Sequence, residues 1–171
     1  MVDTSSIDTR LELLGQKLSS PIVIAPVGSQ KAFHPEGELA TARAAKSRDH
    51  LQILSNVSTT SIEDVIAARG GPVWFQLYPS ADWSVAQTML KRAEDAGAPA
   101  VVLTVDLHSG SNRVSMMRYI SQDKRDCTEC HDRSSEAAWL DRKPMYQGTA
   151  AATAEFDTPG MTWDYIERLK S

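Results

Sequence analysis

The feature that most constrains the fold of this chain is a regular alternation of short apolar runs and helix-like segments over its first 106 residues. Short apolar runs rich in β-branched residues are typical of strands buried in a parallel sheet, and they occur at 21–26, 51–55, 73–78 and 100–106. Segments typical of helices lie between them, at 35–45, 60–68 and 83–96. This alternation predicts consecutive parallel βα units.

Polar residues at the boundaries of these segments support the predicted helices. Glu36 and Glu38 fall in the first turn of the first helix, where the helix dipole favours negative charge. Thr60 or Ser61 can cap the second helix, and Asp82 can cap the third. These residues therefore indicate where each predicted helix begins.

The pattern changes after the fourth apolar run. Residues 107–160 are polar and weakly periodic, which predicts a long loop of the kind that is either functional or completed by a partner. Residues 161–171 resume a helical pattern, with Thr162 as the predicted N-cap. Residues 1–20 are mostly polar and are predicted to form an irregular lead-in, so the βα units occupy 21–106.

Polar residues stand where the predicted strands end, which is where parallel βα folds carry their chemistry. In chain order they are Ser29 and Gln30 in the turn 27–30 after the first strand, then Ser55 and Asn56, Gln76 and Tyr78, Thr104 and Asp106 and, in the following loop, Arg113. Neutral donors and acceptors beside one arginine suit a flat ring with a polar edge and a carboxylate, which a guanidinium can hold with two hydrogen bonds. Each such group can instead satisfy only neighbouring backbone. Four successive strands that end in this way favour a site.

Charge and hydropathy exclude two classes of partner. The 18 Lys and Arg residues are outnumbered by 22 Asp and Glu, so the chain lacks the basic excess of a nucleic-acid-binding domain. No run approaches the ~18 apolar residues that a membrane-spanning helix needs. The first residues also lack the basic and then apolar pattern of a secretory signal. We therefore expect a cytoplasmic protein with no nucleic-acid partner and no membrane span.

Both cysteines fall in one short motif, Cys127-Thr128-Glu129-Cys130-His131. Its spacing matches the c-type haem attachment pattern and also half of a zinc site. Haem attachment requires an oxidising compartment and a pocket, whereas the flanking residues are charged, and a zinc site lacks a clear second pair of ligands. Two reduced thiols in a surface loop are the simplest interpretation, so we expect no metal site.

Several segments, in the same order, resemble the FMN-dependent 2-hydroxy acid oxidoreductases, which include glycolate oxidase, lactate oxidase and the flavin-linked L-lactate dehydrogenases. The matching segments are 21–26 with Gly28 and Gln30, then 34–38, 40–45, 54–55, 61–65, 75–78, 103–106, 112–113 and 162–164. The resemblance is strong from 21 to 113 and loose from 114 to 160. It implies an α/β fold made of the first four βα units of an eight-unit TIM barrel, incomplete and with a long loop after the fourth strand.

The resemblance also implies which residues hold the cofactor, FMN. The backbone at Val27 and Gly28 would approach the flavin ring, and the side chains of Ser55, Gln76 and Thr104 would hydrogen-bond its polar edge. Gly28 stands where members of the family often have alanine, so the packing around it can differ here.

Two further residues are implied to bind the substrate, a small L-2-hydroxy acid. Tyr78 would contact it, and Arg113 would pair with its carboxylate. In this family a base removes a proton while a hydride equivalent passes to FMN, which gives the 2-oxo acid. These residues leave open which 2-hydroxy acid is used, and whether the enzyme is an oxidase or a dehydrogenase.

The family's catalytic histidine base, the arginine that follows it and binds the substrate carboxylate, its flavin-stabilising lysine and its phosphate site would all lie beyond Ser171. We therefore expect these 171 residues alone to be inactive on 2-hydroxy acids and to bind FMN weakly or not at all. The open edges of half a barrel predict self-association or pairing with a complementary half. The alternative is a non-catalytic fragment or interaction protein that needs such a half. A haem or metal protein built on Cys127 and Cys130 is less favoured.

Overall fold

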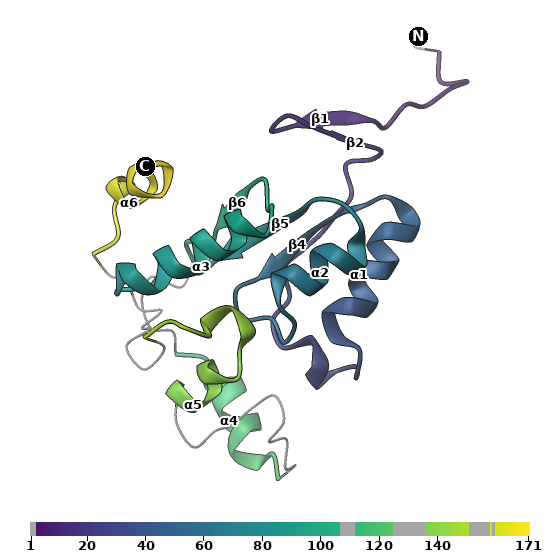
Figure 1. Cartoon of the computed structure of the whole chain (residues 1–171). Coiled ribbons are helices and arrows are strands. Elements are labelled where there is room, and N and C mark those ends of the chain that lie inside the picture. The colour runs from purple at the N-terminus through teal and green to yellow at the C-terminus, as the bar shows by residue number, and fades with distance from the viewer. Residues whose placement is uncertain (1–2, 107–111, 125–135, 151–157, 159) are drawn as a thin grey trace.

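A four-stranded parallel sheet with the order β3-β4-β5-β6 forms the centre of the molecule (Figure 1). The computed structural model describes residues 3–106, 112–124, 136–150, 158 and 160–171. The strands of the sheet are β3 (Val23–Ile24), β4 (Leu51–Ser55), β5 (Val73–Leu77) and β6 (Val101–Leu103). Helices α1 (Gly37–Arg48), α2 (Ile62–Arg69) and α3 (Trp83–Asp95) connect them in turn. The predicted alternation of parallel βα units is confirmed.

The two faces of the sheet differ in what they carry. Val73, Phe75 and Leu77, which alternate along β5, are fully buried in one hydrophobic cluster with residues of α2 and α3. Side chains alternate across a strand, so Trp74 and Gln76 project from the opposite face. One face therefore packs against helices, while the other carries the polar residues predicted to form a site.

The predicted helix caps are confirmed at three helices. Ser61 and Asp82 accept hydrogen bonds from backbone N–H groups of α2 and α3 at 3.2 and 2.9 Å. Thr162 does the same for α6 (Trp163–Lys170) at 3.3 Å. These caps satisfy N–H groups that a helix start leaves without an intrahelical partner.

Replacing Ser61 with alanine should lower the free energy of unfolding by about 1 kcal/mol, because α2 loses its N-cap. Urea denaturation followed by far-ultraviolet circular dichroism measures this. Ser47, an exposed serine within α1, provides the control, and its replacement by alanine should change stability by less than about 0.5 kcal/mol. Equal losses in the two variants would contradict the capping role.

The first and last strands of the sheet are shorter than predicted. β3 pairs with β4 through two residues rather than over 21–26, and β6 spans three residues rather than 100–106. Ile22 is 59% exposed, so the prediction that the first strand is buried on both faces is wrong. Among the residues that the structure describes, both strands lie at an edge of the sheet and have a partner strand on one side only.

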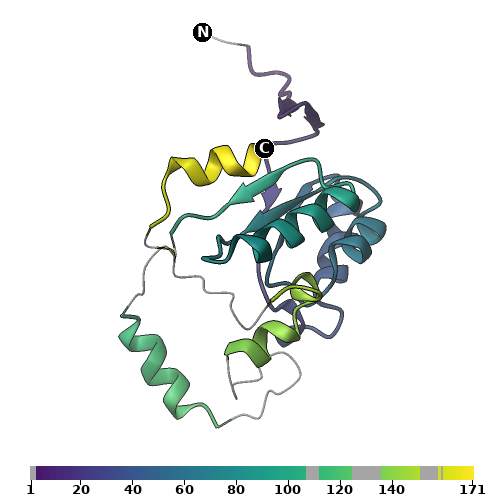
Figure 2. The same cartoon turned by 60° about the vertical axis from the view of Figure 1, so that its left-hand side comes forward.

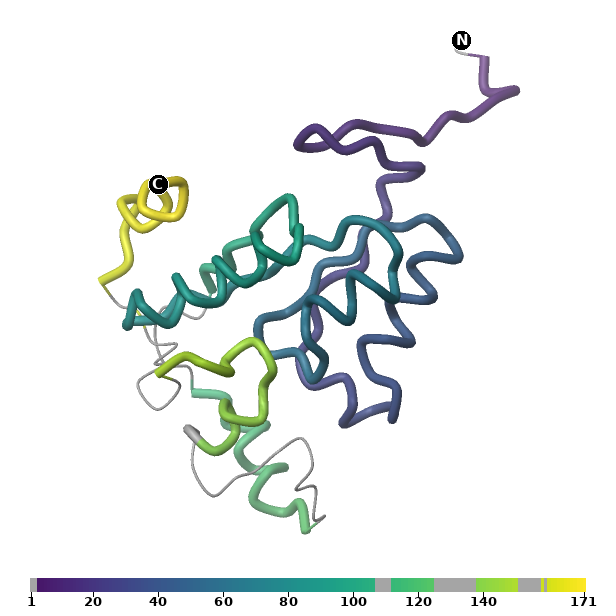
Figure 3. The backbone as a smooth tube through the Cα atoms, in the orientation of Figure 1, coloured from purple at the N-terminus to yellow at the C-terminus, as the bar shows by residue number. Residues whose placement is uncertain are grey.

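The lead-in contains a hairpin that the sequence did not predict. β1 (Leu11–Leu13) and β2 (Gln16–Leu18) pair in antiparallel fashion. The turn residues Leu14 and Gly15 have φ values of 49° and 74°, as the tight turn of a two-residue hairpin requires. Trp74 Nε1 donates a hydrogen bond to Gln16 Oε1 at 3.1 Å, which attaches the hairpin to β5. Figure 3 follows the chain from this hairpin into the sheet.

The prediction of one continuous loop over 107–160 is wrong for the residues that the structure describes there. They include α4 (Val114–Gln122), α5 (Glu136–Asp141) and the 3-10 helix η2 (Pro144–Tyr146). Leu140, Met145 and Tyr146 are at most 2% exposed and belong to the hydrophobic core. Each of these elements is at most nine residues long, which is shorter than the stretch of about 11–18 residues over which a helical period can be recognised, and this explains the error. None of the helices in the described residues is long and apolar enough to cross a membrane.

Candidate functional site

Four predicted site residues form one row across the carboxyl ends of neighbouring strands. Ser55 on β4 is in register with Gln76 on β5, and Gln76 Nε2 donates a hydrogen bond to Thr104 Oγ1 at 2.9 Å. A Cβ added to Gly28 would lie 3.7 Å from Ser55 Oγ, so Gly28 adjoins the same row. The row consists of Gly28, Ser55, Gln76 and Thr104, and the fold brings all four together.

The row offers neutral hydroxyl groups whose protons are available to donate hydrogen bonds. Ser55 Oγ accepts a hydrogen bond from the Val57 backbone N–H at 3.3 Å, and Thr104 Oγ1 accepts one from Gln76. Each hydroxyl therefore keeps its own proton for a ligand. A ring whose edge alternates carbonyl oxygens and N–H groups finds partners here without the cost of burying a charge. The residues of the row fit the polar edge of a flavin.

The remaining predicted site residues divide into two groups. Val27 directly precedes Gly28 and is 50% exposed, and Tyr78 directly follows β5 at the same end of the sheet. Arg113 is exposed at the start of α4, and Figures 1 and 2 both show α4 apart from the sheet. The structure thus places Val27 and Tyr78 beside the row but does not bring Arg113 to it.

A buried carboxylate holds the loops behind the row. Glu38 lies in the first turn of α1 as predicted, but it is fully buried. Its Oε1 accepts hydrogen bonds from the backbone N–H groups of Gln30 at 3.3 Å and Thr59 at 2.8 Å. Its Oε2 accepts from the hydroxyls of Thr59 at 2.7 Å and Thr60 at 2.8 Å. Glu38 therefore fastens the loops that follow β3 and β4 to one helix.

A second support comes from residues 139–146, which we call the brace. Lys143 is fully buried, and its Nζ donates a hydrogen bond to Ser29 Oγ at 2.6 Å. Asn56 Nδ2 donates to the Tyr146 hydroxyl at 3.0 Å. Burial raises the pKa of the Tyr146 phenol, so this group stays neutral. The brace thus reaches the loops after β3 and β4, the same two that Glu38 holds.

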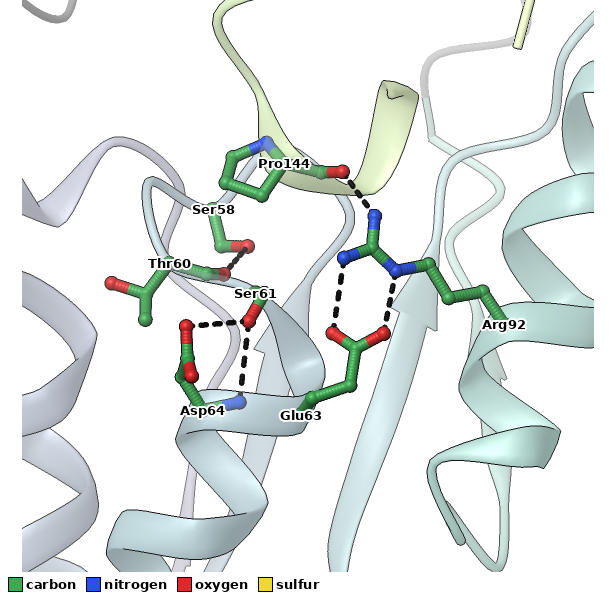
Figure 4. Close-up of polar contacts among 7 residues, drawn as sticks. All are labelled: Ser58, Thr60, Ser61, Glu63, Asp64, Arg92 and Pro144. Carbon is green, nitrogen blue, oxygen red and sulfur yellow. Dashed lines mark hydrogen bonds and ion pairs between the residues drawn. The ribbon is translucent and has the colours of Figure 1, made fainter. Parts of the chain in front are cut away.

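Arg92 joins the brace to the helices (Figure 4). Its Nε and Nη2 donate to the two carboxylate oxygens of Glu63 on α2, at 2.7 and 3.1 Å, and its Nη1 donates to the carbonyl oxygen of Pro144. The hydrogen bonds from Arg92 lower the pKa of Glu63. One side chain of α3 therefore links α2, α3 and the brace.

Sequence reasoning missed the brace because it lies in the segment predicted as a loop. The signal present in the sequence was the apolar spacing of Trp139, Leu140, Met145 and Tyr146 around a proline. The cysteine motif at 127–131 lies outside the described residues. Within the described part of the chain, no group of three or more His, Cys, Asp or Glu residues is placed to hold a metal ion.

Comparison with known proteins relates the chain to flavin enzymes. The family model described as FMN-dependent dehydrogenase matches residues 1–171. The chain is 37% identical over 178 residues to a peroxisomal (S)-2-hydroxy-acid oxidase of Oryza sativa subsp. japonica, covering 100% of this chain and 46% of the relative. It is 45% identical over 171 residues to glycolate oxidase 3 of Arabidopsis thaliana, with the same coverage of 100% and 46%. The chain spans about half the length of these relatives.

Solved structures of mandelate oxidase share the fold. The structure with (S)-4-hydroxymandelic acid gives a TM-score of 0.74 at 30% identity, covering 99% of this chain and 47% of that chain. A variant with a C4a-OH-FMN adduct gives 0.70 at 30% identity, covering 99% and 44%. The sheet and its helices therefore correspond to the first βα units of an incomplete TIM barrel.

Proposed function

The chain belongs to the FMN-dependent dehydrogenase family, and from this membership we propose that it supplies the flavin-ring edge of an enzyme that oxidises a 2-hydroxy acid to the 2-oxo acid. The observation that carries the proposal is the row of Gly28, Ser55, Gln76 and Thr104 at the carboxyl ends of the strands. When bound, FMN supplies the acceptor for the two electrons of this oxidation. The residues of the row bind the ring and fix its orientation.

Each member of the row has a role that its contacts support. The hydroxyls of Ser55 and Thr104 donate hydrogen bonds to acceptors on the ring edge, and Gln76 is held in place by its bond to Thr104. The backbone at Val27 and Gly28 would approach the ring face, a contact that needs no side chain at position 28. These groups would exclude water from the polar edge of the flavin. The face of the ring opposite the backbone at Val27 and Gly28 would be left for the substrate.

The substrate proposed is a small 2-hydroxy acid. The relatives are named for (S)-2-hydroxy acids and glycolate, and the structural neighbours are named for mandelate, so their printed names share a 2-hydroxycarboxylate. Tyr78 lies at the end of β5 and is the proposed substrate contact. Arg113 is kept as the proposed carboxylate partner on the family resemblance. The rice relative is named as peroxisomal, and a cytoplasmic location for this chain stays a prediction.

Replacing Gln76 with leucine should weaken FMN binding about tenfold, the effect of losing one buried hydrogen-bonding group. Quenching of FMN fluorescence on titration with the 171-residue chain measures the affinity, which we expect to be weak in the unmodified chain. Gln87, exposed on α3, provides the control, and its replacement by leucine should leave the affinity unchanged. Equal affinities in all three proteins would contradict the role of the row.

We also propose that these 171 residues alone do not turn over a 2-hydroxy acid. The resemblance assigns the proton-abstracting base to no residue among them. Mixing the chain and FMN with L-lactate or glycolate under anaerobic conditions should leave the flavin absorbance unchanged. Bleaching that depends on the chain would show that a base is present and would contradict this part of the proposal.

The open edges of the sheet favour a second proposal, that the chain pairs with further strands. In the described part of the chain, β3 and β6 each have one partner strand, and Val101 on β6 is 43% exposed. Such edges pair readily with other strands. A complementary half-barrel or a second copy would cover them, and a chain that acts only through such pairing would be an interaction module. Light scattering that shows monomers at every concentration would contradict self-association.

A further inference from the structure

We propose that Lys143 is a positioning residue for the flavin edge, acting through the loop that carries Gly28. The functional consequence rests on the proposed function, whereas the contacts stand by themselves. Lys143 is fully buried, and its Nζ lies 2.6 Å from Ser29 Oγ. Ser29 is the residue directly after Gly28, so the brace holds the loop one residue from the row.

Ser29 has a backbone conformation that must be held. Its φ and ψ are 55° and 39°, in the left-handed region that non-glycine residues rarely adopt. Its backbone N–H donates to the carbonyl oxygen of Val57 at 3.1 Å, and its hydroxyl contacts Lys143. These two bonds fix the orientation of the peptide that joins Gly28 to Ser29. That peptide belongs to the backbone proposed to face the flavin ring.

Lys143 is itself held by a rigid part of the brace. Its Nζ lies 4.8 Å from the centre of the Trp139 ring, a cation–π contact. Its backbone N–H donates to the carbonyl oxygen of Leu140 at 2.7 Å, and its own carbonyl oxygen accepts from Tyr146 at 2.9 Å. Leu140 and Met145 are fully buried in the core. The amine is therefore presented from a fixed support rather than from a mobile surface loop.

The brace makes a second polar contact, through Tyr146, with a residue that directly follows a member of the row; we call the side chains of Lys143 and Tyr146 its two polar arms. Asn56 directly follows Ser55, and its Nδ2 donates to the Tyr146 hydroxyl at 3.0 Å. Its backbone N–H donates to the carbonyl oxygen of Gln76 at 3.0 Å, which ties this loop to β5. Both arms thus end one residue beyond a member of the row. A support whose only task was to cover the core would not need two polar arms at these positions.

Replacing Lys143 with methionine, which keeps the length of the side chain, tests the proposal in the 171-residue chain. Without FMN, the amide chemical shifts of Gly28, Ser29 and Val57 should change, and Ser29→Ala should move the same amides. With FMN, each variant should bind about tenfold more weakly, as expected when a loop loses one buried charge-assisted bond. The double variant should bind FMN no more weakly than Lys143→Met alone, because both substitutions remove the same hydrogen bond, the one between Lys143 and Ser29.

Met89→Ala provides the control, because Met89 is a fully buried core residue of α3. It should lower the melting temperature without moving the loop amides or the FMN affinity. If Lys143→Met and Ser29→Ala behave like Met89→Ala, the positioning role is overturned. If the unmodified chain binds no measurable FMN, the result bears on the affinity of the isolated 171 residues, and the amide shifts measured without FMN still decide the role of Lys143. If Lys143→Met does not fold, the amide shifts and the FMN affinity of Ser29→Ala, which removes one hydroxyl, decide the role of this contact.

Discussion

Replacing Glu38 with alanine should lower the free energy of unfolding by about 3–4 kcal/mol, because a buried carboxylate with several charge-assisted hydrogen bonds is lost and its donors stay buried. Glu38 accepts from two backbone N–H groups and two hydroxyls at 2.7–3.3 Å, and none of its surface is exposed. Water cannot easily replace the carboxylate at a site of this kind. The loops after β3 and β4 should loosen together, since both depend on the same group.

Urea denaturation compared with Glu36→Ala isolates this effect. Glu36 precedes α1 and pairs with Arg43 at the surface, where both side chains are about half exposed. Surface pairs of this kind contribute little, so Glu36→Ala should cost less than about 1 kcal/mol. Glu38→Gln should fall between the two, because the amide keeps the size of the side chain but offers one acceptor oxygen in place of two. A loss for Glu38→Ala no larger than that for Glu36→Ala would show that the buried network is not stabilising.

The row at the strand ends could be predicted from the sequence because its geometry repeats. Ser55, Gln76 and Thr104 occupy the ends of successive strands, and a parallel sheet brings the ends of neighbouring strands to one side. Local patterns locate each strand, and the topology then follows from the short βα connections. The hydrogen bond between Gln76 and Thr104 joins two of these strand ends, and it also depends on the register of β5 with β6, in which Gln76 lies opposite Val102.

The supports of the row could not be predicted in the same way. Lys143 and Ser29 are 114 residues apart, and Tyr146 and Asn56 are 90 residues apart. No periodicity encodes a contact over such a separation. A glutamate in the first turn of a helix satisfies the dipole whether it is exposed or buried, so the position of Glu38 did not reveal its partners. Strand exposure at β3 and β6 also depends on which strands cover the sheet edges, which local sequence does not determine.

Replacing Gly28 with alanine should destabilise the chain by about 1–3 kcal/mol, the usual cost of overpacking. A Cβ at this position would lie 2.6 Å from Val57 Cγ2, closer than real side chains approach. Gly28 is not among the glycines with positive φ, so the backbone itself accepts alanine and the cost is steric. The family resemblance implies alanine as an alternative at this position, and the contact with Val57 is the steric obstacle to it in this chain.

Val57→Ala should restore part of the stability that Gly28→Ala loses, because it removes the Cγ2 methyl group that the new Cβ would meet but leaves the Val57 carbonyl oxygen 3.3 Å away. A double-mutant cycle measured by urea denaturation should give a coupling energy of about 1–2 kcal/mol between the two positions. Gly160 provides the control, because no described residue lies within 4 Å of a Cβ added there. Gly28→Ala in the Val57→Ala background should also retain the FMN affinity of Val57→Ala, since the ring contact is made by backbone. Additive effects would show that Val57 does not determine the residue at position 28, and the steric explanation would then be wrong.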